Sequence, residues 1–490
     1  MPVLTILVGL PALGALLVAL LPKRLARPAA LGASLATLGL ALAAWARFDP
    51  TVPGAFALQD GPWPWIRDLG VSWALGLDGV GLVLVLVTAV LVPTALASDR
   101  TPGRAPAALL LLCESAVLGC FTALDLVLFY AFFEAMLLPV LLVLALWGGP
   151  GRLRAAVRVL LYTLAGSLPL LAAVAATWVH HRSATGVPSA LLADLLATPV
   201  PTSWAPWLFA GFALAFAVKS AAVPLHGWLP DAYAEAPVGA LVVLAGLLAK
   251  AGLFGFLRWA LPLFPEAAIR AGPVLLALGA LGVIYGGLMA WVQQDLKRVV
   301  AWTSVSHLAL CLVGIGAGTP DALAGSAWLA AVHGLYVGAL FLLVDLLEAR
   351  SGRRGVDDFG GLGAMLPRFS FLLGLTVLAA IAVPGLAGFP GEILVIIGTW
   401  RVAPVAAVAG ASGAVLGAVY LLRVLEKVCF GRPSETARVL VDLRPAPTLP
   451  LAVLGLLLVG LGVRPLVNVV TPATDRVAAA LETARTVEAP

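Results

Sequence analysis

The sequence predicts an all-α polytopic membrane protein with about 14 transmembrane helices. Of its 490 residues, 61% are hydrophobic and only 11% are charged, whereas soluble domains carry about 45–50% apolar and about 25% charged residues. Mean hydropathy is +1.04. This composition excludes a water-soluble enzyme and a nucleic-acid-binding chain, so the net charge of +5 is expected to come from loop arginines that face the cytoplasm.

Fourteen apolar stretches are candidates for membrane spans, because a helix needs about 20 mostly apolar residues to cross the bilayer. They cover residues 3–21, 28–46, 78–97, 107–123, 125–147, 157–179, 205–227, 237–261, 272–291, 299–317, 321–347, 370–400, 402–422 and 449–469. The first stretch lacks the basic leader and clear cleavage site of a signal peptide, so we expect it to be retained. The connections 47–77 and 180–204 predict surface loops or lateral helices, and residues 470–490 predict an amphipathic or frayed end.

The distribution of basic residues predicts the orientation of the chain. Loops after odd-numbered spans hold 19 Lys and Arg, whereas loops after even-numbered spans hold 6. By the positive-inside rule the odd-numbered loops are cytoplasmic and both termini lie on the other side. We therefore expect a multi-pass protein of a bacterial inner (plasma) membrane.

Titratable side chains inside the spans are the candidate functional residues, because charge in the bilayer centre is costly. Those near mid-span are Glu134, Lys219, Lys250, His307, His333 and Glu392, and Glu114 and Asp345 lie elsewhere in the apolar runs. The chain has only five lysines against 25 arginines, yet two of these lysines lie mid-span. Since a buried lysine can release its proton and arginine cannot, this choice indicates proton loading and release.

Structural explanations for the same residues stay open. Both mid-span lysines can serve in static salt bridges, and the histidines can be held by neighbouring hydroxyl groups. Glu114 and Asp345 can cap a helix or pair near the interface. The four cysteines (Cys113, Cys120, Cys311 and Cys429) form no CxxC motif, which argues against an iron–sulfur cluster or a c-type haem.

Two proline pairs predict broken helices. Pro224 follows Lys219 and is itself followed by Pro230, and Pro384 precedes Glu392 and is followed by Pro390. Interrupted spans in corresponding positions mark ion sites in transporters built from inverted repeats. We therefore expect N-terminal helices over 1–104, a first five-helix repeat over 105–265, an inverted second repeat over 266–425, and a final span with its tail over 426–490.

At these residues the chain resembles the antiporter-like proton-pumping subunits of respiratory complex I, which are related to subunits of multisubunit sodium/proton antiporters. Within that family it most resembles the subunit M (NuoM) type, the counterpart of mitochondrial subunit 4. The resemblance covers roughly residues 105–430, including the DAYAEAP motif at 231–237. Its strongest stretches are 111–149, 216–265, 293–310, 333–350 and 384–392.

The resemblance implies roles for individual residues. Glu134 matches the glutamate that tunes the proton affinity of the span-seven lysine, Lys219. Lys250 matches the central lysine, and Glu392 matches the span-twelve acid that distinguishes the subunit M type. Other matches are the additional span-four acid Glu114 and the polar linkers His307 and His333. Asp345 departs from the family pattern.

The resemblance also implies a subunit of NADH:quinone oxidoreductase that moves protons and carries no redox centre of its own. FMN, the iron–sulfur clusters and the quinone site are then expected on partner subunits, as this chain has no GxGxxG motif, no Walker loop and no clustered cysteines. Sister antiporter-like subunits are the expected neighbours within the lipid bilayer, with no metal and no nucleic acid bound. The alternatives are a cation/proton antiporter subunit, a hydrogenase- or ferredoxin-linked complex, and a stand-alone solute transporter.

Overall fold

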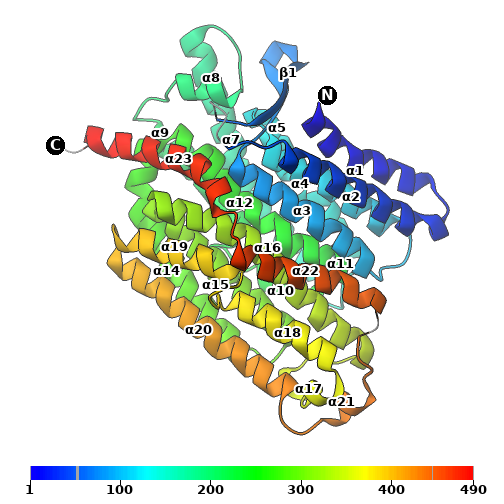
Figure 1. Cartoon of the computed structure of the whole chain (residues 1–490). Helices are drawn as coiled ribbons and strands as arrows, with labels where there is room; N and C mark the ends of the chain where they lie inside the picture. The colour runs from blue at the N-terminus through cyan, green and yellow to red at the C-terminus, as the bar shows by residue number, and fades with distance from the viewer. Residues whose placement is uncertain (1, 51–54, 444, 489–490) are drawn as a thin grey trace.

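The computed structural model describes residues 2–50, 55–443 and 445–488, and these form one helical bundle (Figure 1). The first half contains α1 (Val3–Leu20), α2 (Lys23–Ala46), α3 (Gly79–Ser98), α4 (Ala105–Thr122), α5 (Leu126–Ala135), α6 (Leu137–Trp147), α7 (Arg152–Thr185), α8 (Leu192–Ala197), α9 (Ala205–Lys219), α10 (Leu229–Glu235), α11 (Val238–Val243), η2 (Leu244–Leu248), α12 (Ala249–Gly255), η3 (Phe256–Ala260) and α13 (Leu261–Leu263). The second half contains α14 (Pro265–Val292), α15 (Leu296–Ala317), α16 (Pro320–Ser351), η4 (Val356–Asp358), α17 (Leu362–Met365), α18 (Pro367–Ala380), α19 (Gly388–Trp400), α20 (Pro404–Cys429), α21 (Glu435–Val439), α22 (Pro445–Val463) and α23 (Val467–Glu488). The predicted membrane-spanning helical fold is confirmed.

Eleven helices in the described chain are long and apolar enough to cross a membrane, and the bent pair α22–α23 makes a twelfth. The two other predicted spans, 205–227 and 370–400, fall on shorter apolar helices that are interrupted, α9 and the pair α18 and α19. Both interruptions follow from proline, which removes a backbone hydrogen bond. The total of 14 spans stays a prediction.

A β-hairpin replaces the loops or lateral helices expected over 47–77. Strands β1 (Leu58–Ile66) and β2 (Val71–Leu77) pair antiparallel. The segment is rich in tryptophan and proline, which fit strands and turns better than helix. Figure 1 shows β1 and α8 at one end of the bundle and α17 and α21 at the opposite end.

The C-terminal tail forms the amphipathic helix α23, which bends by 67° from α22. It packs against α3, α14 and α16 and so contacts helices from both halves of the chain. Arg485 at its end donates a hydrogen bond of 3.0 Å to the main-chain oxygen of Ala317. Over the described residues up to 488 the tail is therefore helical and not frayed, while residues 489–490 of the predicted tail lie outside the described residues.

Arg258, which lies near the end of the predicted span 237–261, is 5% exposed. The span continues to Leu263, so this side chain points into the protein, where its Nη2 atom lies 2.8 Å from Oδ1 of Asp78. Rings of Phe56 and Phe254 lie on the guanidinium group, each 4.8 Å from its carbon. A buried arginine is stabilised by such partners.

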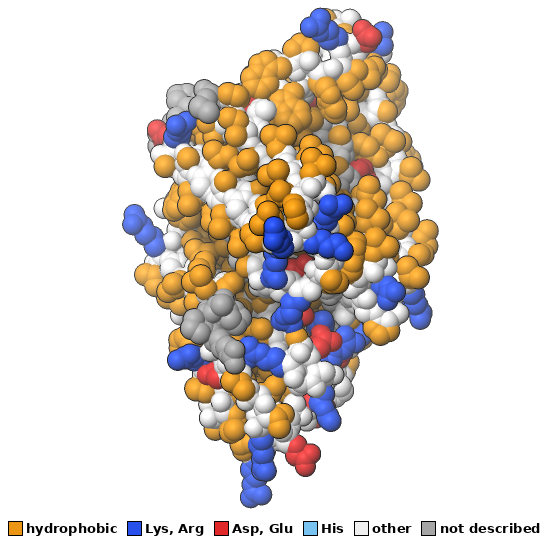
Figure 2. Space-filling model, turned by 90° about the vertical axis from the view of Figure 1, so that its right-hand side faces the viewer, with side chains coloured by type: hydrophobic (Ala, Val, Ile, Leu, Met, Phe, Trp, Pro, Cys, Tyr) orange, Lys and Arg blue, Asp and Glu red, His pale blue; other side chains and the backbone are white. Residues whose placement is uncertain are grey.

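The outer surface of the bundle is apolar, as expected for a protein in lipid. In Figure 2 hydrophobic side chains cover most of the visible face, and Lys and Arg lie mainly across its middle and lower part. Large side chains on α7 and α20 are well exposed, for example Leu168 at 62% and Val415 at 64%. These helices present surfaces suited to lipid or to a neighbouring membrane subunit.

Candidate proton-translocation site

Six of the seven candidate residues are buried inside the bundle, each at no more than 5% exposure: Glu114, Lys219, Lys250, His307, His333 and Glu392. Glu134 is half-buried. They come from seven helices, α4, α5, α9, α12, α15, α16 and α19. Charged side chains are seldom buried without partners, so their local contacts indicate what each can do.

The first group lies where α4 and α5 face α9. The Nζ atom of Lys219 donates a 3.2 Å hydrogen bond to the main-chain oxygen of Phe133 and lies 4.5 Å from the centre of that residue's ring. Glu134 is the residue after Phe133 on α5, and its Oε1 atom has no hydrogen-bond partner in the protein. Lys219 thus lies beside Glu134 without a direct ion pair. A small side-chain movement can change the distance between the two charges.

Glu114 has a separate partner. The hydroxyl of Ser34 on α2 donates a 2.9 Å hydrogen bond to Oε1 of Glu114, while Oε2 has no partner in the protein. This contact ties α4 to the N-terminal helices.

Both predicted helix breaks are present and share three features. Ala221 and Ala382 each have a φ angle of 53°, in a region that few L-residues adopt. The N–H of Ala222 bonds to the oxygen of Ala217 at 2.8 Å, and the N–H of Val383 bonds to that of Leu378 at 3.1 Å, both five residues back.

A tryptophan completes each break. The indole of Trp228 donates to the oxygen of Val218 at 2.9 Å, and the indole of Trp328 donates to that of Ala387 at 3.0 Å. Val218 lies in the last turn of α9, where carbonyl groups have no partner within the helix. Ala387 directly precedes α19 and receives its indole from a different helix, α16. Lys219 is the last residue of α9 and Glu392 lies in the first turns of α19, so the two breaks place one titratable group each.

Lys250 lies on α12 between the π-helical segments η2 and η3. Its ammonium group donates a hydrogen bond to the main-chain oxygen of Ala245. Single-turn π segments occur frequently at functional sites. Two residues later, a Cβ on Gly252 would clash with the main-chain oxygen of Phe216 and lie 3.2 Å from Cβ of Lys219, so this glycine lets α12 approach α9 closely.

The second group forms a chain of polar side chains from α15, α16 and α19. The Nε2 atom of His307 lies 3.7 Å from Oε1 of Glu392, and its Nδ1 atom is 3.0 Å from the hydroxyl of Tyr336. The rings of His307 and His333 are 5.8 Å apart. Helix α12, which carries Lys250, packs against α15 and α16, so Lys250, His333, His307 and Glu392 lie in one buried neighbourhood.

Tyr336 also belongs to the site, although it was not among the residues predicted from the sequence. It lies three residues after His333 on α16, on the same helix face, and its hydroxyl is the partner of His307. The HGLY sequence at 333–336 carries this spacing and could have indicated it.

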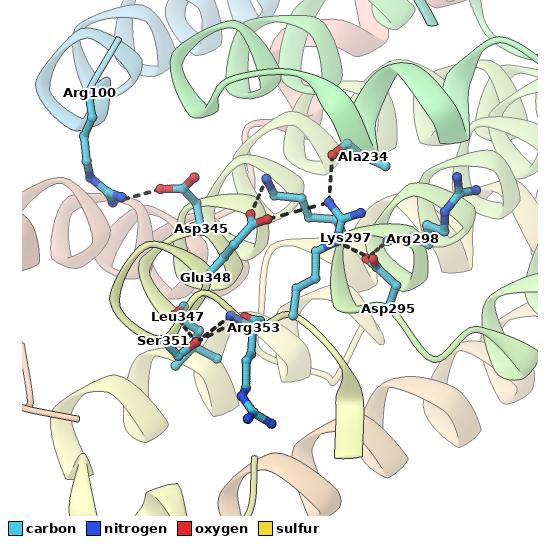
Figure 3. Close-up of polar contacts among 11 residues, drawn as sticks. Arg100, Ala234, Asp295, Lys297, Arg298, Asp345, Leu347, Glu348, Ser351 and Arg353 are labelled. Atoms are coloured by element: carbon cyan, nitrogen blue, oxygen red, sulfur yellow. Dashed lines mark hydrogen bonds and ion pairs between the residues drawn. The ribbon is translucent and has the colours of Figure 1, made fainter. Parts of the chain in front are cut away.

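An ion-pair network lies at the end of the bundle predicted to face the cytoplasm (Figure 3). Glu348 pairs with Lys297 at 2.5 Å and with Arg354 at 3.6 Å, and Arg354 also pairs with Asp295 at 2.6 Å. Asp345, of unassigned role in the sequence, pairs with Arg100 at 2.8 Å. These pairs join α15 and α16 to the loop after α3.

Asp231 of the DAYAEAP motif connects the two halves of the chain. Its carboxylate pairs with Arg158 of α7 and, at 2.9 Å, with Arg298 of α15. In the same motif, Glu235 accepts a 2.8 Å hydrogen bond from the N–H of Gly151. The motif served only as a family marker in the sequence, yet these contacts fix α10, the helix that follows the break at Lys219.

A family model described as "NADH:quinone oxidoreductase/Mrp antiporter, TM" matches residues 123–417, more than half of the chain. The chain belongs to this family. The matched region contains the broken helices and all the candidate residues except Glu114.

Relatives of this antiporter-like subunit support the assignment over most of its length. It is 40% identical to NADH-quinone oxidoreductase subunit 13 of Thermus thermophilus over 81% of this chain and 83% of that protein. It is 36% identical to NADH-quinone oxidoreductase subunit M of Mycobacterium tuberculosis over 97% and 93% of the two chains.

Solved structures agree with the fold of this antiporter-like subunit. A chain in respiratory complex I from Thermus thermophilus superposes with a TM-score of 0.89 at 37% identity, covering 98% of this chain and 99% of that one. A chain of an archaeal membrane-bound sulfane sulfur reductase matches with a TM-score of 0.83 at 24% identity, covering 96% and 77%. The second likeness concerns the fold alone.

Within the described residues, no group of three His, Cys, Asp or Glu side chains is placed to hold a metal ion. The four cysteines are free and buried. The described site residues are lysine, histidine, carboxylate and tyrosine groups.

Proposed function

We propose that this chain is a proton-translocating membrane subunit of NADH:quinone oxidoreductase, complex I. The observation that carries the proposal is the buried neighbourhood of Lys250, His333, His307 and Glu392, built from four helices in a chain of the antiporter-like family. Protons move along groups that can both accept and release them. Arginine in the same places would hold its charge instead.

The proposed route begins at Lys219. Glu134 stabilises the charged ammonium, and a movement of charge or water between the two weakens that interaction. Two unit charges 4 Å apart interact by about 4 kcal/mol at an effective dielectric of 20, enough to change a lysine's proton affinity about a thousandfold. The proton then passes from Lys219 toward Lys250 and through His333 and His307 to Glu392, and Glu114 supplies a further acid near the start.

We assign the remaining chemistry to partner subunits. FMN, the iron–sulfur clusters and the quinone belong there, and this chain carries no redox centre, so its enzyme class is that of the translocase complex. Sister antiporter-like subunits lie on either side of it in a bacterial inner membrane, with both of its termini on the non-cytoplasmic side. The shared geometry of the breaks at Ala221 and Ala382 supports two inverted repeats over 105–265 and 266–425.

A second candidate is a subunit of a multisubunit cation/proton antiporter or of a hydrogenase- or ferredoxin-linked complex. The description of the family, which includes Mrp antiporters, favours keeping it. Names of the relatives that match most of the chain favour complex I. A stand-alone solute transporter has no supporting observation of this kind.

Gentle purification of the tagged native chain separates these candidates. We expect flavin- and iron–sulfur-containing subunits to co-purify, together with NADH:quinone reductase activity. Co-purification of membrane subunits alone, without redox activity, would contradict the complex I assignment and favour the antiporter.

The translocation role is tested by Lys219→Ala in the assembled complex. We expect most NADH-driven proton pumping to be lost in membrane vesicles while the complex remains detectable. Lys23→Ala, at an exposed position, is the control and should leave pumping unchanged. Unchanged pumping per electron in Lys219→Ala would remove this lysine from the route.

A further inference from the structure

A cavity of about 270 Å³ lies where the C-terminal ends of α3 and α16 approach α2 and the beginning of α22. It is separate from the translocation site. Its polar lining includes Arg27, Arg100 and Asp345, and its apolar lining includes Leu342, Leu346 and Leu451. These helix ends are the ones predicted to face the cytoplasm. The cavity therefore combines two cations, one anion and an apolar wall at the edge of the membrane.

The guanidinium group of Arg27 is held by two hydrogen bonds, whereas that of Arg100, whose side chain is 47% exposed, has one ion pair. Arg27 donates from Nε to the oxygen of Leu96 at 3.0 Å and from Nη2 to that of Ala97 at 2.6 Å. Both acceptors are carbonyl groups in the last turn of α3, which have no partner within the helix. Arg100 is held at 2.8 Å from Oδ2 of Asp345 (Figure 3). The charge of Arg27 is thus in place before any ligand binds, which favours binding.

Asp345 contributes the opposite charge. Its side chain is only 14% exposed, and Arg100 is the cation paired with it directly. With Arg27, Arg100 and Asp345 all ionised, the cavity lining has a net charge of one positive unit. A ligand that carries both a negative and a positive group matches this lining better than a simple anion, which the carboxylate would repel.

The depth of the cavity fits the polar boundary of a bilayer. Asp345 lies six residues before the end of α16 at Ser351, or about 9 Å along the helix. Leucine side chains continue the wall from there. Basic pockets between membrane helices on the cytoplasmic side are typical sites for anionic lipid headgroups, and the carboxylate of Asp345 distinguishes this cavity from them.

We propose that this cavity binds the headgroup of an aminophospholipid of the phosphatidylethanolamine type. The phosphate faces Arg27 and Arg100, the primary ammonium faces Asp345, and the glycerol end rests on Leu346 and Leu451. A choline headgroup lacks N–H donors for Asp345, and a glycerol headgroup lacks the cation. This binding is independent of the proposed proton route, because none of these residues belongs to it.

Native mass spectrometry of the purified complex tests the proposal. The complex is stripped of lipid by detergent exchange and offered equal amounts of dioleoyl phosphatidylethanolamine, phosphatidylglycerol and phosphatidylcholine. We expect one tightly retained phosphatidylethanolamine in the wild type. Arg27→Gln should weaken its retention about tenfold, the effect of one lost charge-assisted hydrogen bond.

The carboxylate of Asp345 is the group expected to select a headgroup that contains an ammonium. Asp345→Asn should remove the preference for phosphatidylethanolamine over phosphatidylglycerol. Arg438→Gln and Glu435→Gln, at exposed positions on α21, are the charge-matched controls and should keep the wild-type ratio. The proposal would be overturned if the wild type and Asp345→Asn retained the three lipids in the same proportions.

Two further measurements keep the test decisive. Leu346→Trp fills the apolar part of the cavity without changing its charge, so it should release the retained lipid even if Asp345→Asn assembles poorly. Soluble phosphoethanolamine is the probe for a free ligand. If it displaces the lipid at equal concentration, the cavity is a site for a small soluble phosphate and the lipid assignment is wrong.

Discussion

The imidazole of His307 on α15 faces the carboxylate of Glu392 on α19, with 3.7 Å between Nε2 and Oε1. Both side chains are at most 5% exposed. Glu392 follows a helix break, whereas His307 lies in an uninterrupted helix. The end of the proposed route is therefore a fixed histidine beside an acid on a broken helix.

Glu392→Gln keeps the shape of the side chain but removes its ability to exchange a proton. We expect proton pumping to fall on the order of a hundredfold, as for loss of one acid–base group, while assembly is retained. NADH-driven fluorescence quenching in membrane vesicles measures this. Glu435→Gln, on the exposed helix α21, is the matched control, and equal pumping by the two variants would exclude Glu392 from the route.

Tyr336→Phe removes the hydroxyl that contacts Nδ1 of His307 at 3.0 Å. A buried nitrogen left without its partner costs about 1–3 kcal/mol, so we expect lower thermal stability and slower pumping, with a smaller effect than in Glu392→Gln. The control is Tyr285→Phe, because that side chain is 37% exposed on α14 and lies outside the proposed route. If the two variants pump equally well, the tyrosine has no part in proton transfer.

Gly252→Ala tests the close approach of α9 and α12. The added methyl group would clash with the main-chain oxygen of Phe216 beside Lys219, and overpacking of this kind costs about 1–3 kcal/mol. We expect a lower melting temperature and impaired pumping. Gly39→Ala on α2 has nothing within 4 Å of the new Cβ and should behave as wild type. A Gly252→Ala complex with unaltered melting temperature and pumping would show that this packing is not needed.

Asp231→Asn removes the charge that connects Arg158 and Arg298. The arginines are partly exposed, so we expect a loss of only about 1 kcal/mol in stability, but a clear loss of pumping per NADH because α10 is no longer fixed. Asp357→Asn breaks the pair with Lys427 at the same end of the bundle and serves as the control. Equal loss of coupling in both variants would contradict a specific role for Asp231.

Much of the architecture follows from the order of residues along the chain. Apolar stretches of span length set where helices cross, because backbone groups in lipid must bond within their own segment. Pro224 and Pro384 interrupt their helices whatever the neighbouring helices are, since proline removes a local backbone hydrogen bond. The mid-span lysines, histidines and glutamates could also be identified from the sequence, because a charged side chain is costly to place near the centre of the membrane.

The contacts among these residues depend on which helices pack together, and hydropathy along one span carries no information about its neighbours. Lys219 bonds to Phe133 rather than to Glu134, and Tyr336 joins His307 from another helix. The hairpin at 58–77 likewise forms by pairing between strands. The sequence by itself determined the membrane helices, their breaks and the titratable groups, whereas tertiary packing alone decided which of those groups meet, because distances between helices are set by side chains far apart in the chain.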